Sequence, residues 1–233
     1  MINREKIPVC ETCFVSNDIF RHLTKDEVDV ISYLKNCNTY KKGEVIYNET
    51  GRVTGIYCIN SGIVKHYKTG NDGKEQIIRF SKKGDIFGFR AILSGESACT
   101  STKVIEDCSL CFIPATHFLK LIKENSGFSM SVMKLSCKEL GESNQYILDI
   151  AQKNVRERLA EILLLLHDSF GVNKEGELNI FLTREELAGI VGTATESVIR
   201  LLSEFKKDKL IELNKRKIKL LDIPKLKRIS KVY

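Results

Sequence analysis

The spacing of the apolar residues changes near residue 115, and the two spacings predict two kinds of structure. Before this point, short runs rich in isoleucine, valine and aromatic residues alternate with turn sequences such as Asn60-Ser61-Gly62. Nine of the 15 glycines fall between Gly43 and Gly95. Short strands separated by glycine turns are typical of an antiparallel barrel or sandwich. The expected strands are residues 44–47, 55–59, 63–67, 76–80, 103–105 and 109–113.

The next part of the chain, as far as Phe170, contains no proline, which favours helices. Met133, Leu140 and Ile147 recur every seven residues, and Ile150 follows three residues later. An apolar seven-residue repeat predicts a helix that pairs with another helix. The alternative is a helix that packs on its own domain. We expect a dimerisation helix over residues 126–153, with contacts at Met133, Leu140, Ile147 and Ile150.

Residues 183–205 have the spacing of a helix-turn-helix. Thr183, with Glu186 three residues later, forms the capping box that begins a helix, and Gly192 is a natural stop. A second helix is expected to start near Ala194. Its inward face has the four apolar residues Val198, Leu201, Leu202 and Phe205.

Two short strands are expected after this second helix, at residues 210–213 and 217–221. The basic turn Asn214-Lys215-Arg216 joins them. Strands in this position form a β-wing, and a basic wing tip can lie over DNA phosphates.

The outward face of the second helix has side chains that can read DNA. Arg200 can donate two hydrogen bonds to guanine, and Glu196, one turn earlier, can accept one from cytosine. The alternative is an ordinary ion pair between these two side chains, worth about 0.3–0.5 kcal/mol. The expected DNA contacts are Thr183, Arg184, Thr193, Thr195, Glu196, Ser197, Ile199, Arg200, Lys215 and Lys217.

The net charge of +7 is concentrated at the C-terminal end of the chain. From Arg200 onward there are twelve lysines and arginines against four acidic residues. This asymmetry indicates either a polyanion partner or a solvated basic face. The longest apolar run, residues 162–166, is far too short for a membrane span, and the first residues contain no apolar signal core. We therefore expect a cytoplasmic protein with no membrane partner.

The order of β-barrel, long pairing helix and winged helix-turn-helix resembles the Crp/Fnr superfamily of bacterial transcription regulators. The resemblance runs from about Phe20 to Ile229 and is most specific at residues 183–188 and 196–202. It implies an α+β fold with an N-terminal antiparallel β-roll or jelly-roll of the cyclic-nucleotide-binding type. It also implies a homodimer on a near-palindromic site in double-stranded DNA. The expected domains are residues 1–125 (sensor), 126–153 (dimerisation helix) and 154–233 (DNA binding).

Within the sensor domain, the resemblance argues against cAMP as the ligand. Residues 83–88 match the turn that leads into the family's phosphate cassette, but the position of the ribose-binding glutamate is Phe89. Residues 97–101 lack the arginine that would bind the phosphate. The same region is more similar to the oxygen-sensing Fnr branch. The loop Gly70–Gln76 resembles a family surface that touches RNA polymerase.

The eight cysteines suggest a metal or redox site. The Fnr branch holds a [4Fe–4S] cluster with three N-terminal cysteines and one barrel cysteine, and Cys10, Cys13 and Cys111 match three of these positions. The third N-terminal position is Ile19, so Cys108 is the substitute and Cys99 the reserve. We expect Cys37, Cys58 and Cys137 to be isolated packing residues. Zinc, a thiol–disulfide pair, another ligand or no metal are the alternatives.

Two other classes of function fit parts of the chain. One is a small cupin-type metalloenzyme, although the barrel lacks a clustered histidine and glutamate motif. The other is a ligand-binding module that acts on protein partners. A DNA-binding regulator without enzymatic activity accounts for more of the sequence, and loss of DNA affinity with rising salt would separate it from both alternatives.

Overall fold

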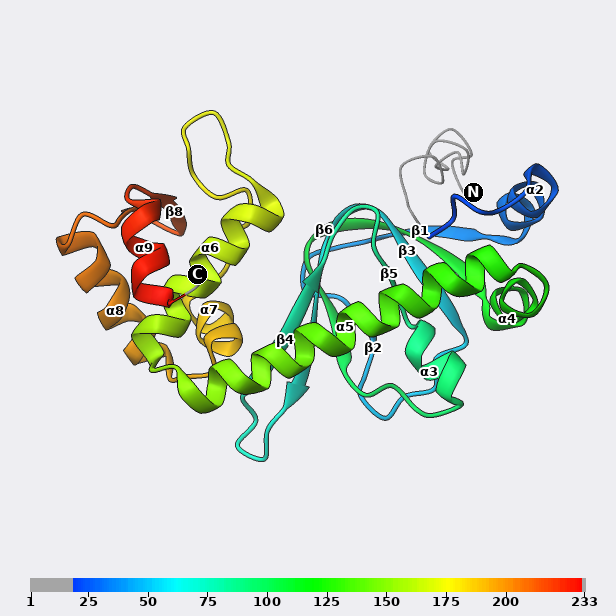
Figure 1. Cartoon of the computed structure of the whole chain (residues 1–233), viewed down its shortest axis with the longest axis horizontal. Coiled ribbons are helices and arrows are strands. Elements are labelled where there is room, and N and C mark those ends of the chain that lie inside the picture. Colours follow the sequence, from blue (N-terminus) through cyan, green and yellow to red (C-terminus); the bar gives the residue numbers. More distant parts are fainter. Residues whose placement is uncertain (1–18, 232–233) are drawn as a thin grey trace. The chain divides into compact units, whose positions relative to one another are not determined.

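The computed structural model describes residues 19–231 (Figure 1). Contacts divide the chain into two compact units. The first contains the residues up to Lys68 and Ile78–Glu142, and the second contains Thr69–Ile77 and the residues from Ser143 onward. In the part of the chain that the structure describes, no helix has the length and apolar character needed to cross a membrane.

The first unit is built on antiparallel strands with helices around them, as the α+β prediction required (Figure 1). The sheet has the strand order β1-β6-β3-β4, with β2 paired to β6 and β5 paired to β3. The elements are α2 (Lys25–Leu34), β1 (Asn36–Tyr40), β2 (Val45–Tyr47), β3 (Gly55–Thr69), β4 (Glu75–Ser81), β5 (Ile86–Phe87), α3 (Phe89–Ser94), β6 (Ser101–Pro114), α4 (Ala115–Glu124) and α5 (Ser126–Gln152).

The two central strands are longer than the sequence pattern predicted. The expected strands at 55–59 and 63–67 are one strand, β3, and those at 103–105 and 109–113 are one strand, β6. The predicted turn at Asn60-Ser61-Gly62 is wrong, because the chain passes through it as a bulge with a register shift against β6. Gly62 has a φ of +87°, and a Cβ there would lie 2.4 Å from the carbonyl oxygen of Asp107. Glycine thus permits the bulge without breaking the strand.

Strand β1 is an element that the apolar pattern missed. Its sequence, Asn-Cys-Asn-Thr-Tyr, has little apolar character, and most of its residues are exposed or half-buried. It is nevertheless paired along its whole length with β6, from Asn36 opposite Phe112 to Tyr40 opposite Cys108. Pairing with a buried neighbour, and not burial of its own side chains, accounts for this strand.

Two apolar clusters form the core of the first unit. One contains Phe20, Ile31, Phe118 and Phe128, together with residues of β3 and β6 such as Ile113. The other contains side chains from the same two strands with the opposite alternation, namely Ile59, Val64, Val104, Cys108 and Leu110, together with Phe87 of β5. Because successive side chains of a strand point to opposite faces, β3 and β6 contribute to both clusters.

A buried histidine lies beside the second cluster. His66 is 3% exposed, and its two ring nitrogens lie 3.0 Å from the hydroxyl oxygens of Ser81 and Thr102. The ring also meets Phe87 edge-on. Burial, aided by the charge of Arg79, holds the pKa of His66 well below its ordinary value of 6.5. Both hydroxyls can therefore satisfy a neutral ring.

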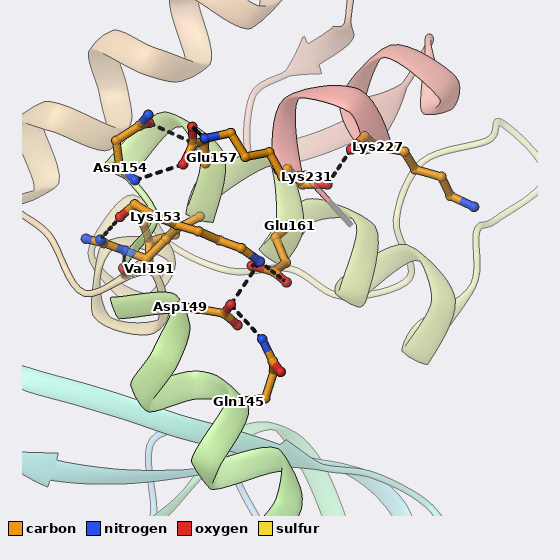
Figure 2. A network of polar contacts seen from close by, with 11 residues as sticks. Gln145, Asp149, Lys153, Asn154, Glu157, Glu161, Val191, Lys227 and Lys231 are labelled. Carbon is orange, nitrogen blue, oxygen red and sulfur yellow. Dashed lines mark hydrogen bonds and ion pairs between the residues drawn. The ribbon is translucent and has the colours of Figure 1, made fainter. Parts of the chain in front are cut away.

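The second unit contains the C-terminal end of α5 and the elements that follow it. These are α6 (Val155–Phe170), α7 (Arg184–Val191), α8 (Thr195–Lys207), β7 (Ile211–Asn214), β8 (Lys217–Leu220) and α9 (Ile223–Ser230). α6 begins with a capping box between Asn154 and Glu157, and buries Leu159, Leu163 and Leu166. Glu157 also pairs with Lys231 at 2.7 Å, which joins the beginning of α6 to the end of α9 (Figure 2).

A polar network joins the end of α5 to α6 (Figure 2). The ammonium of Lys153 lies 2.9 Å from Asp149 and 2.8 Å from Glu161, and all three side chains are largely buried. Burial alone would lower the pKa of Lys153, but the hydrogen bonds to Glu161 and Asp149 raise it. Gln145 donates a further hydrogen bond to Asp149 at 2.9 Å.

The guanidinium of Arg158 joins three helices at the same place. It donates hydrogen bonds to the carbonyl oxygens of Lys153 at 2.7 Å, Val191 at 2.9 Å and Gly192 at 3.1 Å. These carbonyls follow α5 or end α7, where helices leave acceptors without an internal partner. Arg158 therefore sets how α7 sits on the junction between α5 and α6.

We expect the free energy of unfolding to fall as the pH drops below about 6.5. Above this pH His66 is neutral in the folded and the unfolded chain, so it adds no pH dependence. Below it the unfolded chain takes up a proton that the buried ring resists. Urea unfolding at about pH 7.5 and pH 5.5 measures the difference. His66→Gln should reduce this pH dependence, whereas the matched variant His117→Gln should keep it, and an unchanged dependence in His66→Gln would contradict the assignment.

Candidate nucleic-acid interface and sensor thiols

Helices α7 and α8 form the predicted helix-turn-helix. The hydroxyl of Thr183 accepts a hydrogen bond from the Glu186 amide at 3.0 Å, and the Glu186 carboxylate accepts one from the Thr183 amide at 2.8 Å. Gly192 ends α7 in the left-handed conformation, with a φ of +71°. α8 then begins at Thr195 after Ala194. The capping box, the glycine stop and the start of the second helix are therefore confirmed.

Helix α8 buries one face and exposes the other. Its inward residues are those that the sequence predicted, and each is at most 4% exposed: Val198, Leu201, Leu202 and Phe205. Glu196, Ile199 and Arg200 are exposed on the outward face. Thr195 and Ser197, at the N-terminal turn, and Thr193 before it, are half-buried. The structure therefore leaves a polar surface at the N-terminal part of α8.

Arg200 is paired with a residue other than Glu196. Its guanidinium lies 2.6 Å from Glu204, one turn further along α8, and Glu204 also receives a hydrogen bond from Arg156 at 3.1 Å. The alternative of a Glu196–Arg200 ion pair does not describe this structure. The Arg200 side chain is 67% exposed, and pairs of this kind contribute about 0.3–0.5 kcal/mol. Arg200 can therefore exchange Glu204 for another partner at little cost.

The wing is formed by β7 and β8, with Lys215 at its tip. Lys215 is exposed and has a φ of +53°. The side chain of Arg184 donates a hydrogen bond to the Lys215 carbonyl at 3.1 Å, which ties the start of α7 to the wing. The ammonium of Lys217 lies 2.6 Å from Glu177, and this hydrogen bond raises the pKa of Lys217. Of the basic residues expected to contact DNA in this region, Lys215 is thus exposed, while Arg184 and Lys217 hold the wing in place.

The loop expected to meet RNA polymerase belongs to the second unit. At its tip, Asp72 and Lys74 form an exposed ion pair of 2.8 Å. At its end, the amide of Gln76 donates hydrogen bonds to the Tyr146 hydroxyl at 2.6 Å and to the carbonyl of Gly189. A Cβ at Gly189 would lie 2.7 Å from the Glu75 carbonyl oxygen. Glycine in α7 therefore allows the loop backbone to approach the helix closely.

Helix α5 exposes the apolar residues that the seven-residue repeat predicted. Met133, Leu140, Ile147 and Ile150 are 56%, 62%, 66% and 40% exposed. Side chains of this size usually find a partner in a stable assembly. Along α5 the chain therefore offers an apolar stripe that its own residues leave largely uncovered.

The cysteines are arranged differently from the predicted metal site. Cys10 and Cys13 lie outside the described residues. Cys108 and Cys111 are three residues apart in a continuous strand, so their side chains point to opposite faces of the sheet. Cys108 packs in the cluster with Leu110, and burial raises its pKa to about 11. The pairing of Cys108 with Cys111 as metal ligands is therefore wrong.

Cys111 has two other thiols beside it. It is directly opposite Cys37 of β1 and directly opposite Cys58 of β3, and cross-strand partners share one face of the sheet. We name this set the thiol row: Cys37, Cys111 and Cys58. Cys37 and Cys58 are therefore not isolated, contrary to the prediction, although Cys58 does pack against the apolar cluster that contains Phe118. Cys137, also predicted to pack, is exposed, as is the reserve candidate Cys99.

The Cys37 and Cys111 thiols affect each other's pKa. A hydrogen bond with Cys111, aided by the charge of Lys35, lowers the pKa of Cys37 to about 7 against the opposing effect of burial. The same hydrogen bond and burial raise the pKa of Cys111. Within residues 19–231, no group of three or more histidine, cysteine, aspartate or glutamate side chains is arranged to hold a metal ion. The described thiols therefore do not fit a complete [4Fe–4S] site.

The cassette region also differs from a nucleotide site. Phe89, at the position of the ribose-binding glutamate, is 2% exposed and packs in the cluster with Phe118 and Phe128. Arg90 pairs with Glu96 at 2.9 Å on the surface. A buried phenyl ring offers no hydrogen bond to a ribose.

Two domain families match the chain. Residues 37–125 match the cyclic nucleotide-binding domain, and residues 157–229 match the Crp-like helix-turn-helix domain. Among curated proteins, the fumarate and nitrate reduction regulatory protein of Vibrio cholerae is 26% identical over 96% of this chain and 90% of its own length. Electron transport regulator A of Shewanella oneidensis is 29% identical over 84% of this chain and 78% of its own length.

Solved structures show the same fold. FixK2 from Bradyrhizobium japonicum aligns with a TM-score of 0.77 and 24% identity, covering 84% of this chain and 97% of its own. A CooA mutant from Carboxydothermus hydrogenoformans aligns with a TM-score of 0.72 and 26% identity, covering 87% and 90%.

The matched proteins are transcription regulators and not enzymes, which decides against the cupin-type alternative. The two domain matches together span more than half of the chain and occur in the order that the elements predicted. The helix-turn-helix and the wing lie within the second match. The chain belongs to the Crp/Fnr superfamily of DNA-binding transcription regulators.

Proposed function

We propose that this regulator binds a near-palindromic site in double-stranded DNA as a homodimer and that its first unit responds to a redox or gas signal. The observation that supports DNA reading most directly is the surface of α8. Glu196 and Arg200 are exposed on successive turns near its N-terminus, while the opposite face is buried. This is the end of a recognition helix that reaches base edges in the major groove.

The chemistry of the exposed pair supports readout of a G·C-containing half-site. The Arg200 guanidinium can donate to O6 and N7 of guanine, and the Glu196 carboxylate can accept from N4 of cytosine. Lys215 at the exposed wing tip is proposed to contact a phosphate. Thr183, Thr193, Thr195, Ser197 and Ile199 are proposed as further contacts, and Arg184 and Lys217 act through the wing that they hold.

Homodimer formation is proposed from the stripe on α5. The four exposed apolar residues lie at seven- and three-residue spacings, as in a helix that pairs with a copy of itself. A two-fold dimer presents two recognition helices, which matches a near-palindromic site. The exposed turn with Asp72 and Lys74 is the proposed contact for RNA polymerase.

The proposal of a redox or gas signal is supported by the relatives. Two of them are named for fumarate and nitrate reduction and for electron transport. We propose no cAMP site, because Phe89 is buried where a ribose ligand would be needed. We also propose a cytoplasmic location, which is consistent with binding to DNA.

Arg200→Ala should weaken binding to the specific site by about 5- to 150-fold, because a bidentate guanine contact is worth about 1–3 kcal/mol. Non-specific affinity should change much less. A site is first selected from random duplexes, and fluorescence anisotropy then measures both affinities at one salt concentration. Arg228→Ala removes the same charge from an exposed position on α9 and should keep specificity. Equal specificity in both variants would rule out readout by Arg200.

Leu140→Glu should dissociate the homodimer, because it places a charge in an apolar seam. Its side chain is 62% exposed in the single chain, so the fold itself should tolerate the change. Sedimentation velocity across a range of concentrations measures the dissociation constant, with an expected increase of at least about tenfold. Lys134→Glu, at an exposed position of α5 off the stripe, is the control. A Leu140→Glu protein as dimeric as the control would contradict the proposed interface.

Iron and sulfide content tests the cluster prediction. Cys111 is the middle member of the thiol row, whereas Cys108 faces the other side of the sheet and packs inside the other core cluster. If the protein purified without oxygen contains iron and sulfide, Cys111→Ser should lose them and Cys108→Ser should retain them. Absorbance and metal quantification on the same samples give the answer. If the wild-type protein contains no iron or sulfide, the cluster prediction is refuted, whereas the DNA-binding proposal is unaffected.

A further inference from the structure

The thiol row gives the first unit a chemical site that neither the family matches nor the named relatives describe. Cys37, Cys111 and Cys58 occupy adjacent strands in direct register, so three sulfur atoms share one face of the sheet. Cys111 is 7% exposed, and Cys37 and Cys58 are half-buried. Thiols placed this close can react with one another as well as pack.

We propose that Cys37 and Cys111 are an oxidation site, at which a hydroperoxide converts the two thiols into a cross-strand disulfide. The strand geometry supports the bond. Directly opposed residues of antiparallel strands have Cα atoms about 4.5–5.5 Å apart. Disulfides span Cα separations of about 4.4–6.8 Å, so β1 and β6 need not move apart or slide.

Cys37 is the better partner for Cys111 than Cys58 is. The Cys37 and Cys111 thiols are hydrogen-bonded to each other. Cys37 also belongs to β1, which lies at one end of the strand order β1-β6-β3-β4, whereas Cys58 is in the interior strand β3. The side chain of Cys58 packs against the apolar cluster that contains Phe118 and Phe128. A small oxidant therefore reaches Cys37 more readily than the other two sulfur atoms.

The chemistry balances with hydrogen peroxide as the oxidant. The Cys37 sulfur attacks one peroxide oxygen, the O–O bond breaks, and a sulfenic acid and one water form. The Cys111 sulfur then attacks the Cys37 sulfur, the S–S bond forms, the S–O bond breaks, and the oxygen leaves as a second water with the Cys111 proton. The two thiols lose two electrons, and these electrons reduce the peroxide. No metal takes part in this chemistry.

The disulfide also removes a possible metal ligand. Once oxidised, Cys111 has no thiolate to offer to a metal ion. The oxidation site and any metal bound at Cys111 therefore exclude each other.

Mapping of disulfides in metal-free protein tests the inference. The full chain is treated with a chelator, reduced, desalted and exposed to a small excess of hydrogen peroxide. Remaining thiols are alkylated, and the protein is digested without reductant for mass spectrometry. We expect the loss of two of the eight thiols, a peptide that links Cys37 to Cys111, and recovery of both thiols with dithiothreitol.

Three serine variants sharpen the result. Cys111→Ser removes the resolving thiol, so the Cys37 sulfenic acid should persist and react with dimedone. Cys58→Ser and Cys137→Ser, matched controls from the row and from the exposed surface, should still form the link. If one variant fails to fold, the disulfide map of the wild-type protein still tests the inference.

Several results would overturn the inference. One is a wild-type protein in which Cys37 stays fully alkylated after peroxide treatment. Another is a disulfide between Cys58 and Cys111 instead of one between Cys37 and Cys111. A third is oxidation of both Cys37 and Cys111 without a disulfide between them. DNA binding by the reduced protein is measured in parallel. Protein that binds DNA but forms no link refutes this inference alone, and protein that forms the link but does not bind DNA refutes only the proposed function.

Discussion

The placement of the DNA-reading helices depends on one guanidinium at the junction of three helices. Arg158 donates hydrogen bonds to the carbonyl oxygens of Lys153, Val191 and Gly192, which lie just after α5 and at the end of α7. Those oxygens would otherwise lack partners, and a cation is favoured at helix C-termini. Lys153, whose carbonyl Arg158 holds, also has its ammonium between Asp149 and Glu161. The network in Figure 2 therefore makes the end of α5 and the start of α6 one rigid joint.

This joint matters because the surface proposed to contact DNA is built from short elements. α7 has only eight residues, and the wing strands have four each. Their relative positions rely on side chains that bridge elements, such as Arg184 to the Lys215 carbonyl and Lys217 to Glu177. Arg184 and Lys217, which the sequence suggested as DNA contacts, therefore hold the wing in place. Arg200 and Lys215 stay exposed, and the partner of Arg200 is the partly exposed Glu204.

In the first unit, the two faces of β3 and β6 separate two kinds of chemistry. One face has the buried His66 with its two hydroxyl partners and the apolar cluster around Cys108. The other face has the thiol row, in which Cys111 lies between Cys37 and Cys58. On the first face, Cys108 packs among apolar side chains, and burial raises its pKa. A cysteine on the second face has a partner thiol within bonding reach.

Much of this protein could be predicted from the residues in order along the chain. The Thr183 capping box, the Gly192 stop and the inward face of α8 depend on interactions within about four residues, so the local pattern contains them. The apolar repeat of α5 is local for the same reason. The strand β1 and the partners of Cys111 could not be predicted in this way. Cys37 and Cys111 are far apart along the chain, and only the register of β1 against β6 brings them together. Sheet register comes from pairing between distant segments, and it also determines which face each cysteine shares, so these features emerge only when the strands assemble.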